Sequence, residues 1–442
     1  MALKELQQRF ALFDTSGEMW VIDLEQIEKI KSGASNEDVA FYKKTPAEIK
    51  MKRFLEGLAV SSDPKTIIVQ FWTSPNTIEF KGLAFSPLST PPNILNFWVS
   101  NLVDPKQGDW SQLRLFIEQI ICSGSNECAT YIINFLAHML QHPEKKPGII
   151  IVLLGSQGTG KGTFFNLLRK IWSRTTLQVN DVDHVVGNFN AVLEQNYVVC
   201  MDEALFAGER KKLERLKSLI TEPVLRIEQK YQPSRTIASF HRFFAASNSE
   251  QFAHIEKDDR RFVFLKVSDS QKCNPEYFDA IHKLLDDGAV ISAMVYDLLQ
   301  IDLSSFNPRL RPKTNEHINQ KLQSLDGFER YWFEALHSKN LGCVDTSFND
   351  WSEARFVSTE SLTSSYKSFN KNADRYGVFQ SRDIAKSLKK LCPSAKKDKG
   401  KASHGKEARG YSLPQIDIAR GEFESAIGGV IDWTDGYGGD DV

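Results

Sequence analysis

A short segment that combines an apolar run, a glycine-rich turn and an amphipathic helix constrains the fold of this chain more than any other. Residues 149–154 are Ile-Ile-Ile-Val-Leu-Leu, which suits a strand buried on both faces of a parallel sheet. The following turn contains Gly155, Gly158 and Gly160, and an amphipathic helix is predicted over residues 164–172. Glycines let backbone N–H groups converge on one point, to which the helix adds its positive N-terminal end. The segment therefore predicts an α/β fold with a phosphate site at the end of a buried strand.

The lysine after the last glycine indicates which phosphates the turn would hold. Lys161 adds a mobile cation for the β- and γ-phosphates of a nucleoside triphosphate. The usual phosphate loop has Ser or Thr directly after this lysine to bind Mg²⁺, but here Gly162 takes that position and Thr163 follows. Thr163 is thus a candidate to ligate the metal, to bind a phosphate or to cap the helix. We expect ATP and Mg²⁺ as cofactors. The predicted cofactor-binding residues are Gly155, Ser156, Gln157, Gly158, Thr159, Gly160, Lys161, Gly162 and Thr163.

Two further apolar segments end in polar residues that suit the same chemistry. Residues 195–201 form an apolar strand that ends at Asp202 and Glu203. In a phosphate-loop enzyme such an aspartate holds Mg²⁺, and the adjacent glutamate can act as general base toward the attacking water. Residues 242–246 predict another buried strand, and the amide of Asn248 just beyond it can orient that water. Hydrolysis of a nucleoside triphosphate is the chemistry that these residues favour.

Cations occur at two places that a nucleic-acid motor would use. Alternating apolar and polar residues around a Gln-Pro-Ser turn predict a β-hairpin that presents Lys230, Tyr231 and Arg235. A cation beside an aromatic ring suits a single strand, because charge binds phosphate and the ring stacks on a base. Arg260 and Arg261 precede a fourth predicted strand, from which an arginine can reach the γ-phosphate held by a neighbouring subunit. A solvated hairpin and a solvated charge run are the alternative interpretations.

The order of these motifs resembles that of the superfamily 3 helicases of viruses, phages and plasmids, small AAA+-type motors that form rings, usually hexamers, around nucleic acid. The motor motifs lie between Gly155 and Arg261. The resemblance implies that the Lys230 hairpin contacts DNA, that Asn248 is the sensor, and that Arg260 or Arg261 is the arginine finger.

A wider likeness, over about residues 80–442, is to the helicase portions of phage and prophage primase-helicases and primase-polymerases. Its segments are Phe85-Ser-Pro, Leu95-Asn-Phe-Trp, Gly108-Asp-Trp, Ala137-His-Met-Leu-Gln-His-Pro, Arg409-Gly-Tyr-Ser-Leu-Pro and Ile431-Asp-Trp. The catalytic primase domain of that family is not found upstream. We therefore expect either a stand-alone helicase or a piece of a longer protein.

The residues beyond the motor predict a winged-helix-like domain. Helices are expected over residues 359–372 and 381–391, and a strand is expected from Gly410. The lysine-rich residues 396–409 would then be a flexible basic wing that binds duplex phosphates. A solvated lysine loop is the alternative. The candidate nucleic-acid residues in this stretch are Lys396, Lys397 and Lys399.

Composition bounds the class of protein. Hydrophobic residues make up 41% and charged residues 25% of the chain, and the formal net charge is −1, so nucleic-acid binding requires local basic patches. Six cysteines without zinc spacing favour a reducing cytoplasm, that of the bacterial host if a phage encodes the chain. No apolar run reaches the roughly 18 residues of a membrane span, so no membrane partner is expected.

Five regions follow from these patterns. They are a mixed α/β region (1–90), a helical collar (91–146), the AAA+-type ATPase motor with its parallel sheet (147–305), the C-terminal winged-helix-like α+β domain (313–434) and a disordered tail (435–442). In the first region, residues 10–13 and 19–22 predict a hairpin, and residues 66–72 predict a strand or a buried helix end.

We expect an ATP-dependent DNA helicase of phage or mobile-element replication that hydrolyses ATP at the subunit interfaces of a homo-oligomeric ring and moves along single-stranded DNA. The family resemblance implies that the ring is a hexamer. The expected partners are single-stranded and fork DNA, further copies of the chain, and a primase or polymerase domain or protein. The catalytic candidates are Lys161, Glu203, Asn248, Arg260 and Arg261, and the metal candidates are Asp202 and Thr163. Two alternatives stay open: a loader or origin-recognition module that uses ATP as a clamp, and a nucleotide kinase, because Gly-Lys-Gly-Thr also occurs in adenylate-kinase-like loops.

Overall fold

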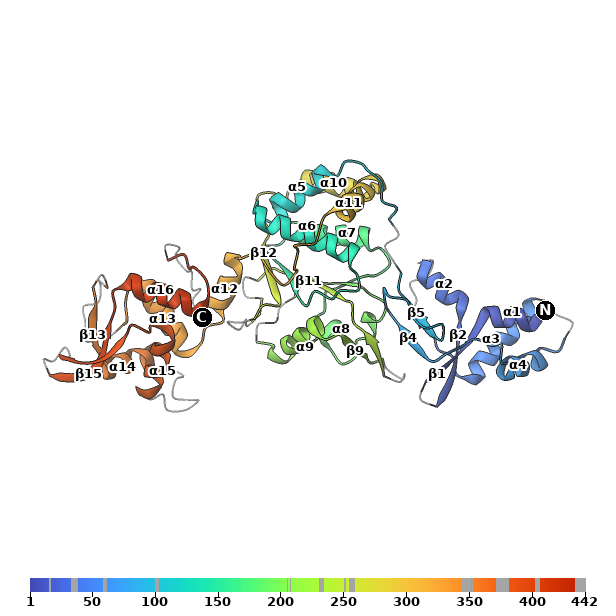
Figure 1. The fold of residues 1–442 in the computed structure, drawn as a ribbon, viewed down its shortest axis with the longest axis horizontal. Helices are drawn as coiled ribbons and strands as arrows, with labels where there is room; N and C mark the ends of the chain where they lie inside the picture. Colours follow the sequence, from blue (N-terminus) through green and yellow to red (C-terminus); the bar gives the residue numbers. More distant parts are fainter. Residues whose placement is uncertain are drawn as a thin grey trace. The chain divides into compact units, whose positions relative to one another are not determined.

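The protein is described by a computed structural model in which two compact units are distinguished, and each unit is considered by itself (Figure 1). The first unit comprises residues 1–252 and 260–312, and the second comprises residues 253–259 and 313–442. The residues described are 1–15, 17–32, 39–58, 62–99, 103–204, 206, 208–229, 234–249, 252–253, 259–342, 351, 353–370, 381–401 and 406–433. The tail expected to be disordered (435–442) lies outside them.

A five-stranded parallel sheet forms the centre of the first unit. Its strands are β6 (Ile150–Leu154), β7 (Thr176–Val179), β8 (Val198–Met201), β11 (Arg242–Ser247) and β12 (Phe262–Lys266). They lie in the order β12-β6-β11-β8-β7. Every residue of β6, β8 and β11 is buried, as expected for central strands of a parallel sheet that is covered on both faces. The order inserts β11 between the strand that leads into the glycine-rich turn and the strand that leads to Asp202.

Helices cover the two faces of this sheet (Figure 1). On one face lie α6 (Asn126–Gln141), α7 (Lys161–Ile171), α10 (Pro275–Asp286) and α11 (Gly288–Gln300), and on the other lie α8 (Asp183–Val186) and α9 (Arg210–Thr221). Within the segment predicted as a helical collar, helix α5 (Ser111–Leu115) continues as a π-helix over Phe116–Ile121. The wider turns of a π-helix often mark functional positions.

The N-terminal segment of the first unit contains the predicted hairpin. Strands β1 (Phe10–Thr15) and β2 (Glu18–Asp23) pair antiparallel, which confirms that prediction. Residues 66–72 belong to helix α4 (Pro64–Thr73), so the strand interpretation is wrong. The helix starts there because Asp63 caps it, its side chain accepting from the N–H of Lys65 and Thr66, and because proline suits a first helical turn.

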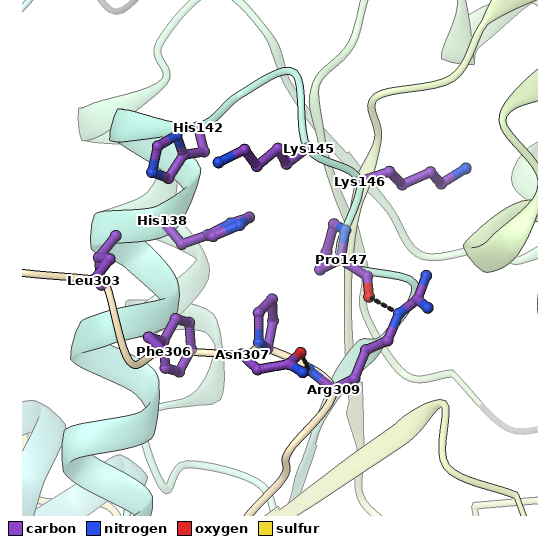
Figure 2. Close-up of a pocket in the computed structure, with 10 residues that line it drawn as sticks. His138, His142, Lys145, Lys146, Pro147, Leu303, Phe306, Asn307 and Arg309 are labelled. Carbon is purple, nitrogen blue, oxygen red and sulfur yellow. Dashed lines mark hydrogen bonds between the residues drawn. The ribbon is translucent and has the colours of Figure 1, made fainter.

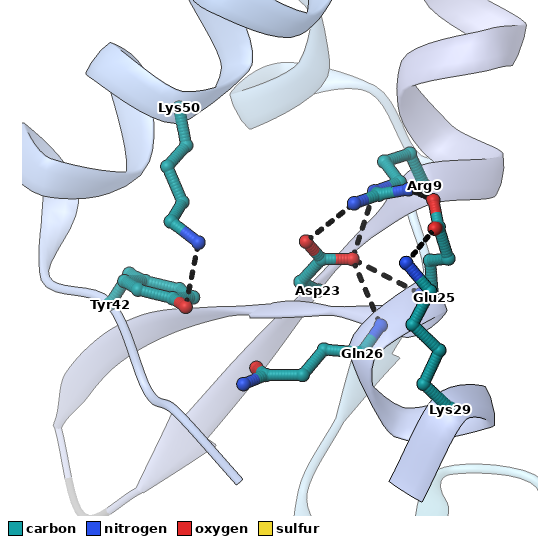
Figure 3. Close-up of polar contacts among 7 residues, drawn as sticks. All are labelled: Arg9, Asp23, Glu25, Gln26, Lys29, Tyr42 and Lys50. Carbon is teal, nitrogen blue, oxygen red and sulfur yellow. Dashed lines mark hydrogen bonds and ion pairs between the residues drawn. The ribbon is translucent and has the colours of Figure 1, made fainter. Parts of the chain in front are cut away.

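The remaining elements of this segment pack around that hairpin. They are α1 (Ala2–Arg9), α2 (Leu24–Ser32), α3 (Lys44–Gly57), β3 (Glu79–Phe80), β4 (Gly82–Ala84) and β5 (Ile94–Asn96). Figure 3 shows how Asp23 joins two of them: one carboxylate oxygen accepts from the backbone N–H of Glu25 at 3.1 Å, and the carboxylate pairs with Arg9 Nε at 2.9 Å. Asp23 thereby caps α2 and ties it to the end of α1.

The second unit is a small α+β fold with a core of its own. Its elements are α12 (Asn315–Gln323), α13 (Gly327–Ser338), β13 (Arg355–Ser358), α14 (Thr359–Phe369), α15 (Ser381–Leu391), β14 (Lys396–Lys401), β15 (Glu407–Leu413) and α16 (Ile416–Ile427). The strands form an antiparallel sheet in the order β13-β15-β14. The helix predicted over 359–372 is present as far as Phe369, and residues 371 and 372 lie outside the described residues; the helix over 381–391 and the strand through Gly410 are confirmed.

The basic stretch departs from the prediction. Residues 396–401 were expected to belong to a flexible wing, but they form strand β14, with Lys396 opposite Ser412 and Lys401 opposite Glu407. Lysine is a poor strand former, and pairing with β15 overrides that preference. Edge strands often carry lysine because its charge disfavours pairing with another chain.

Candidate nucleotide-binding site

The glycine-rich loop, residues 155–160, joins β6 to α7 at the carboxyl edge of the sheet. Gly158 has φ +79° and Gly160 has φ +104°, backbone conformations that glycine adopts readily and other residues rarely adopt. A Cβ atom at Gly160 would also lie 2.8 Å from the ring of Phe278. Gly160 is the N-cap of α7 and Lys161 is its first residue. The free N–H groups of the first helical turn therefore face the loop.

Lys161 binds to the loop that precedes it. Its Nζ donates to the carbonyl oxygens of Gly155 at 2.5 Å and Ser156 at 2.8 Å, and the residue is 7% exposed. Burial lowers the pKa of Lys161, while the negative charges of Asp202, then Asp269 and Glu203, act in the opposite direction. The ammonium thus lies within the field of the acidic residues. A charged phosphate oxygen is a stronger hydrogen-bond acceptor than the two neutral carbonyl oxygens that the ammonium of Lys161 contacts.

Gly162 and Thr163 occupy different surroundings. A side chain at Gly162 would meet no atom within 4 Å, so the space beside this residue is open. Thr163 is 8% exposed, and one helical residue corresponds to a turn of about 100° around the axis. The hydroxyl of Thr163 therefore projects in another direction, and its role as a metal ligand stays a prediction.

Asp202 and Glu203 follow β8, and Asp202 is held by a neighbouring strand. Gln178 of β7 donates its amide to Asp202 Oδ2 at 3.2 Å, and Arg169 of α7 donates in turn to Gln178 Oε1. The backbone N–H of Glu203 donates to Asp202 Oδ1 at 3.1 Å. Glu203 has φ +53°, a left-handed conformation that non-glycine residues rarely adopt and that clusters at functional sites.

Asn248 lies at the same edge of the sheet, beyond β11. Ser247, the last residue of β11, pairs with Leu154 of β6, and its carbonyl accepts from the N–H of Gly155 at 3.2 Å. On the other side, β11 pairs in parallel with β8, which leads to Asp202. The side chain of Asn248 is exposed. The strand order therefore brings Asn248 between the glycine-rich loop and the acidic pair.

Arg260 and Arg261 lie at the opposite edge. Phe262 of β12 pairs with Ile150 of β6, and the N–H of Ile150 donates to the carbonyl of Arg261 at 2.8 Å. The two arginines thus stand at the amino end of these strands, whereas Gly155 follows the carboxyl end. A strand of this length extends about 17 Å, which exceeds the reach of an arginine side chain. Neither arginine reaches the loop of its own chain.

The segment that follows β12 covers the glycine-rich loop. Asp269 accepts from Ser156 Oγ at 2.8 Å, and the N–H of Cys273 donates to the carbonyl of Gly158 at 3.1 Å. Sequence reasoning missed Asp269, Gln178 and Arg169, because each acts through a contact between distant segments and none belongs to a local motif.

The predicted hairpin is present as β9 (Val224–Ile227) and β10 (Arg235–Ala238), which pair antiparallel. Lys230 and Tyr231 lie outside the described residues. Arg235 forms two hydrogen bonds with the carboxylate of Glu194, and its guanidinium lies 5.7 Å from the centroid of the Phe41 ring. Arg235 is thus engaged within the first unit, and its predicted contact with nucleic acid stays a prediction.

A second contact ties the hairpin to the same segment. The buried Asn190 donates its amide to the carbonyl of Arg226 at 3.0 Å and accepts from the N–H of Glu228 at 2.9 Å. We refer to Asn190 and Glu194 as the hairpin clamp. Both lie in the segment that leads into β8, so the hairpin is attached to the chain just before the strand that leads to Asp202.

The lysines predicted to bind nucleic acid form one edge of the second unit. Lys396, Lys397 and Lys399 are exposed on β14. Lys399 stands directly opposite Arg409 of β15, and like charges at opposed positions of a sheet destabilise it. Helix α15 adds four further exposed cations, which are Arg382, Lys386, Lys389 and Lys390, and Lys390 pairs with Glu329.

In the described part of the chain, no group of three or more His, Cys, Asp or Glu side chains is arranged to hold a metal ion. Among the same residues, no helix has the length and apolar character that crossing a membrane requires.

Comparison with known proteins relates the chain to phage replication proteins. Residues 153–261 match the model of a family of unknown function, DUF5906. Over 144 residues the chain is 31% identical to the DNA primase-polymerase of Nitratiruptor phage NrS-1, a match that covers 32% of this chain and 20% of that protein. The matched segment thus spans one fifth of the length of this relative.

Solved structures extend the likeness to almost the whole chain. Two apo structures of the NrS-1 C-terminal region align with a TM-score of 0.62 at 15% identity, over 93% of this chain and 98% of theirs. A third aligns with a TM-score of 0.60 at 16% identity. The chain is therefore related to the C-terminal region of the NrS-1 primase-polymerase and shares its mixed α/β fold with a parallel sheet. The expected likeness to phage primase-polymerases is confirmed to that extent.

Proposed function

We propose that the chain is an ATP-driven DNA helicase of phage replication, with an AAA+-type motor in its first unit and a winged-helix-like domain in its second. The observation that carries the proposal is the meeting of Lys161, Asp202, Glu203 and Asn248 at one edge of the parallel sheet. These are the groups that hydrolysis of a bound triphosphate requires. The name of the NrS-1 relative, a DNA primase-polymerase, supports replication as the setting.

Each residue at this edge has a role in the proposed reaction. Lys161 exchanges the loop carbonyls for β- and γ-phosphate oxygens. Asp202, oriented by Gln178, holds Mg²⁺, which neutralises the phosphate charge when it is bound. Glu203 accepts the proton of the attacking water, and Asn248 orients that water. The open space beside Gly162 fits this reading, because it leaves room for the metal and its waters.

The arginines support hydrolysis at an interface between copies of the chain. Arg260 and Arg261 stand at the amino edge of the sheet and cannot reach the loop of the same chain. In a head-to-tail arrangement the amino edge of one copy faces the carboxyl edge of the next, which yields equivalent heterologous contacts; these form a ring when the rotation between copies closes. One of the two arginines then stabilises the transferred γ-phosphoryl group of the neighbour.

The hairpin and the basic strand supply the proposed contacts with DNA. The hairpin clamp joins β9 and β10 to the segment that leads into β8, so a change at Asp202 is transmitted toward Lys230 and Tyr231. Lys396, Lys397 and Lys399 on β14 bind duplex phosphates at a fork, which explains the like charges of Lys399 and Arg409 at opposed positions.

The test is the ATPase rate as a function of protein concentration, with and without single-stranded DNA. We expect specific activity that rises with concentration and collapses in Lys161→Ala and in one of Arg260→Ala and Arg261→Ala. Mixing that arginine variant with Lys161→Ala should restore part of the activity, because one intact site then forms between two defective copies. Arg53→Ala, an exposed arginine of α3, is the control.

Activity that is independent of concentration and untouched by either arginine change would refute the shared site. Phosphate transfer to a nucleoside monophosphate without DNA would favour the kinase alternative instead. DNA binding that needs ATP but survives Glu203→Gln would favour the clamp.

A further inference from the structure

A cavity of about 360 Å³ lies in the first unit, away from the glycine-rich loop (Figure 2). Its walls are the end of α6, the connection from α6 to β6, and the segment that follows α11. Pro147, which lines it, lies just before the amino end of β6, whereas the loop follows the carboxyl end. The two places are thus at opposite edges of the sheet, about one strand length or 17 Å apart.

Two cationic side chains at the rim of the cavity are not paired with a carboxylate of the described residues. Lys145 is exposed, and its ammonium makes no ion pair or hydrogen bond with the residues that the structure describes. Arg309 donates from Nε to the carbonyl of Pro147 at 3.2 Å, and its terminal amino groups have no acceptor in the described part of the chain. Glu144 is the carboxylate nearest in sequence, and it lies 3.6 Å from the ring nitrogen of His142. The rim therefore carries a positive charge.

One lysine at the cavity does not add to the positive charge of the rim. Lys146 also lines it, but its Nζ donates to the carbonyls of Leu219 and Glu222 and to Ser239 Oγ. Figure 2 shows its side chain directed away from the cavity, whereas that of Lys145 lies along the rim.

The inner wall offers an aromatic floor and one unsatisfied polar atom. His138 is 6% exposed, and its Nδ1 is buried without a hydrogen-bond partner among the described residues. Buried polar atoms are normally paired, so this atom points to a ligand. The ring of Phe306 packs edge-on against His138, with 6.2 Å between their centroids, and is only partly buried. Leu303 extends the apolar surface.

We propose that this cavity binds one phosphorylated nucleoside, with the phosphate held by Lys145 and Arg309 and the base packed against Phe306 and His138. A cationic rim above an aromatic floor matches a ligand that is anionic at one end and flat and apolar at the other. The volume is at the small end of the range for small-molecule pockets, about 300 to 1,000 Å³, which suits a single nucleotide. A free mononucleotide and one unit of a DNA strand share this chemistry.

The experiment measures binding of labelled dAMP to the full chain by equilibrium dialysis, in a Lys161→Ala background so that the glycine-rich loop does not contribute. Inorganic phosphate and a short oligodeoxynucleotide are the competitors. Lys145→Ala combined with Arg309→Ala removes the rim charges, and Leu303→Trp fills the cavity without touching them. Lys65→Ala combined with Arg53→Ala, one exposed lysine and one exposed arginine elsewhere, is the matched control.

We expect both cavity variants to weaken dAMP binding at least tenfold relative to the control, and dAMP to shift the imidazole NMR signals of His138. Binding of the oligodeoxynucleotide alone, with the same sensitivity to both variants, would identify a DNA strand as the source of the nucleotide. Binding that is equal in the cavity variants and the control, or ligand binding that leaves the His138 signals unmoved, would overturn the proposal.

Nucleotide binding in the cavity does not depend on ATP hydrolysis at the glycine-rich loop, so either one can be refuted without the other. The ATPase rate of the Lys145/Arg309 variant with Lys161 intact tests the motor in the same preparation. Loss of ATPase in Lys161→Ala together with an absent cavity ligand would leave the proposed function standing and remove this inference alone.

Discussion

Removing the carboxylate of the hairpin clamp, by Glu194→Ala, is expected to loosen the hairpin formed by β9 and β10. Glu194 accepts two hydrogen bonds from Arg235, and their side chains are 7% and 17% exposed. The change leaves the guanidinium of Arg235 largely buried without its counter-ion. The penalty is the desolvation of an unpaired charge rather than the loss of one attractive contact.

The burial of Arg235 and Glu194 determines how much free energy the hairpin loses. Breaking a buried ion pair by removing one partner costs about 3 to 5 kcal/mol. Because part of Arg235 still reaches water, we expect the lower end, about 3 kcal/mol, for the local opening of the hairpin. That free energy corresponds to an increase of about 150-fold in the population of the open form.

Amide hydrogen exchange of β9 and β10 measures this opening directly, since exchange reports local stability strand by strand. Protection of the central strands β6 and β11 should stay unchanged. The matched control is the double variant Glu194→Met/Arg235→Met, which removes both charges together and should exchange within about tenfold of the wild type.

Wild-type protection of the hairpin in Glu194→Ala would refute the reasoning, as would a double variant that is worse than the single one. The same pair of proteins tests the predicted role of Arg235. If Arg235 contacts DNA, the double variant keeps an ordered hairpin but loses the stimulation of ATPase by single-stranded DNA.

Three further predictions concern pH, the metal and the second unit. Burial lowers the pKa of His241 to about 4, below the ordinary value of about 6.5, so between these pH values the unfolded chain binds a proton that the fold does not. Stability should therefore fall by up to about 3 kcal/mol as pH decreases through this window, and urea midpoints of His241→Gln should depend less on pH than those of the wild type. Gln178→Leu should raise the Mg²⁺ concentration for half-maximal ATPase by about tenfold, because an orienting partner of Asp202 is lost; an unchanged Mg²⁺ requirement would contradict this role. Replacing Lys397 and Lys399 by alanine should reduce the salt slope of duplex binding by about 2, and an unaltered slope would show that β14 does not contact phosphate.

The glycine-rich loop could be predicted because its signal is local. The apolar run, the glycines of the turn and Lys161 lie within a few residues of one another, and strand, turn and helix N-terminus are each encoded by neighbours in sequence. The positions of the acidic pair and of Asn248 near this loop could be predicted as well, because the carboxyl ends of parallel strands share one edge of a sheet.

The contacts that hold these residues could not be predicted in the same way. Gln178 meets Asp202 because β7 pairs with β8, and nothing near Gln178 in the sequence indicates that pairing. Glu194 and Arg235 are 41 residues apart, so Arg235 was interpreted as a ligand for nucleic acid, without knowledge of its partner.

Two departures from the sequence patterns have different physical origins. The apolar residues 66–72 predict either a strand or a buried helix end, and Asp63 followed by Pro64 is the helix start that decides for the helix. The strand β14 could not be inferred from residues that disfavour strands. Its pairing with β15 is a tertiary effect.

The left-handed backbone of Glu203 also determines which variants a screen for folding would detect. A non-glycine residue in that conformation costs about 1 to 2 kcal/mol, and glycine loses about 0.5 to 1 kcal/mol more in chain entropy than alanine when it is fixed. The relief of strain is equal to the entropic cost or exceeds it by up to about 1 kcal/mol, so Glu203→Gly is expected to fold at least as stably as the wild type, with a thermal midpoint that is no lower. It would nevertheless lack the proposed general base. Natural or laboratory selection that rewards abundance alone would therefore let this residue drift to glycine, and only selection for replication would retain the glutamate.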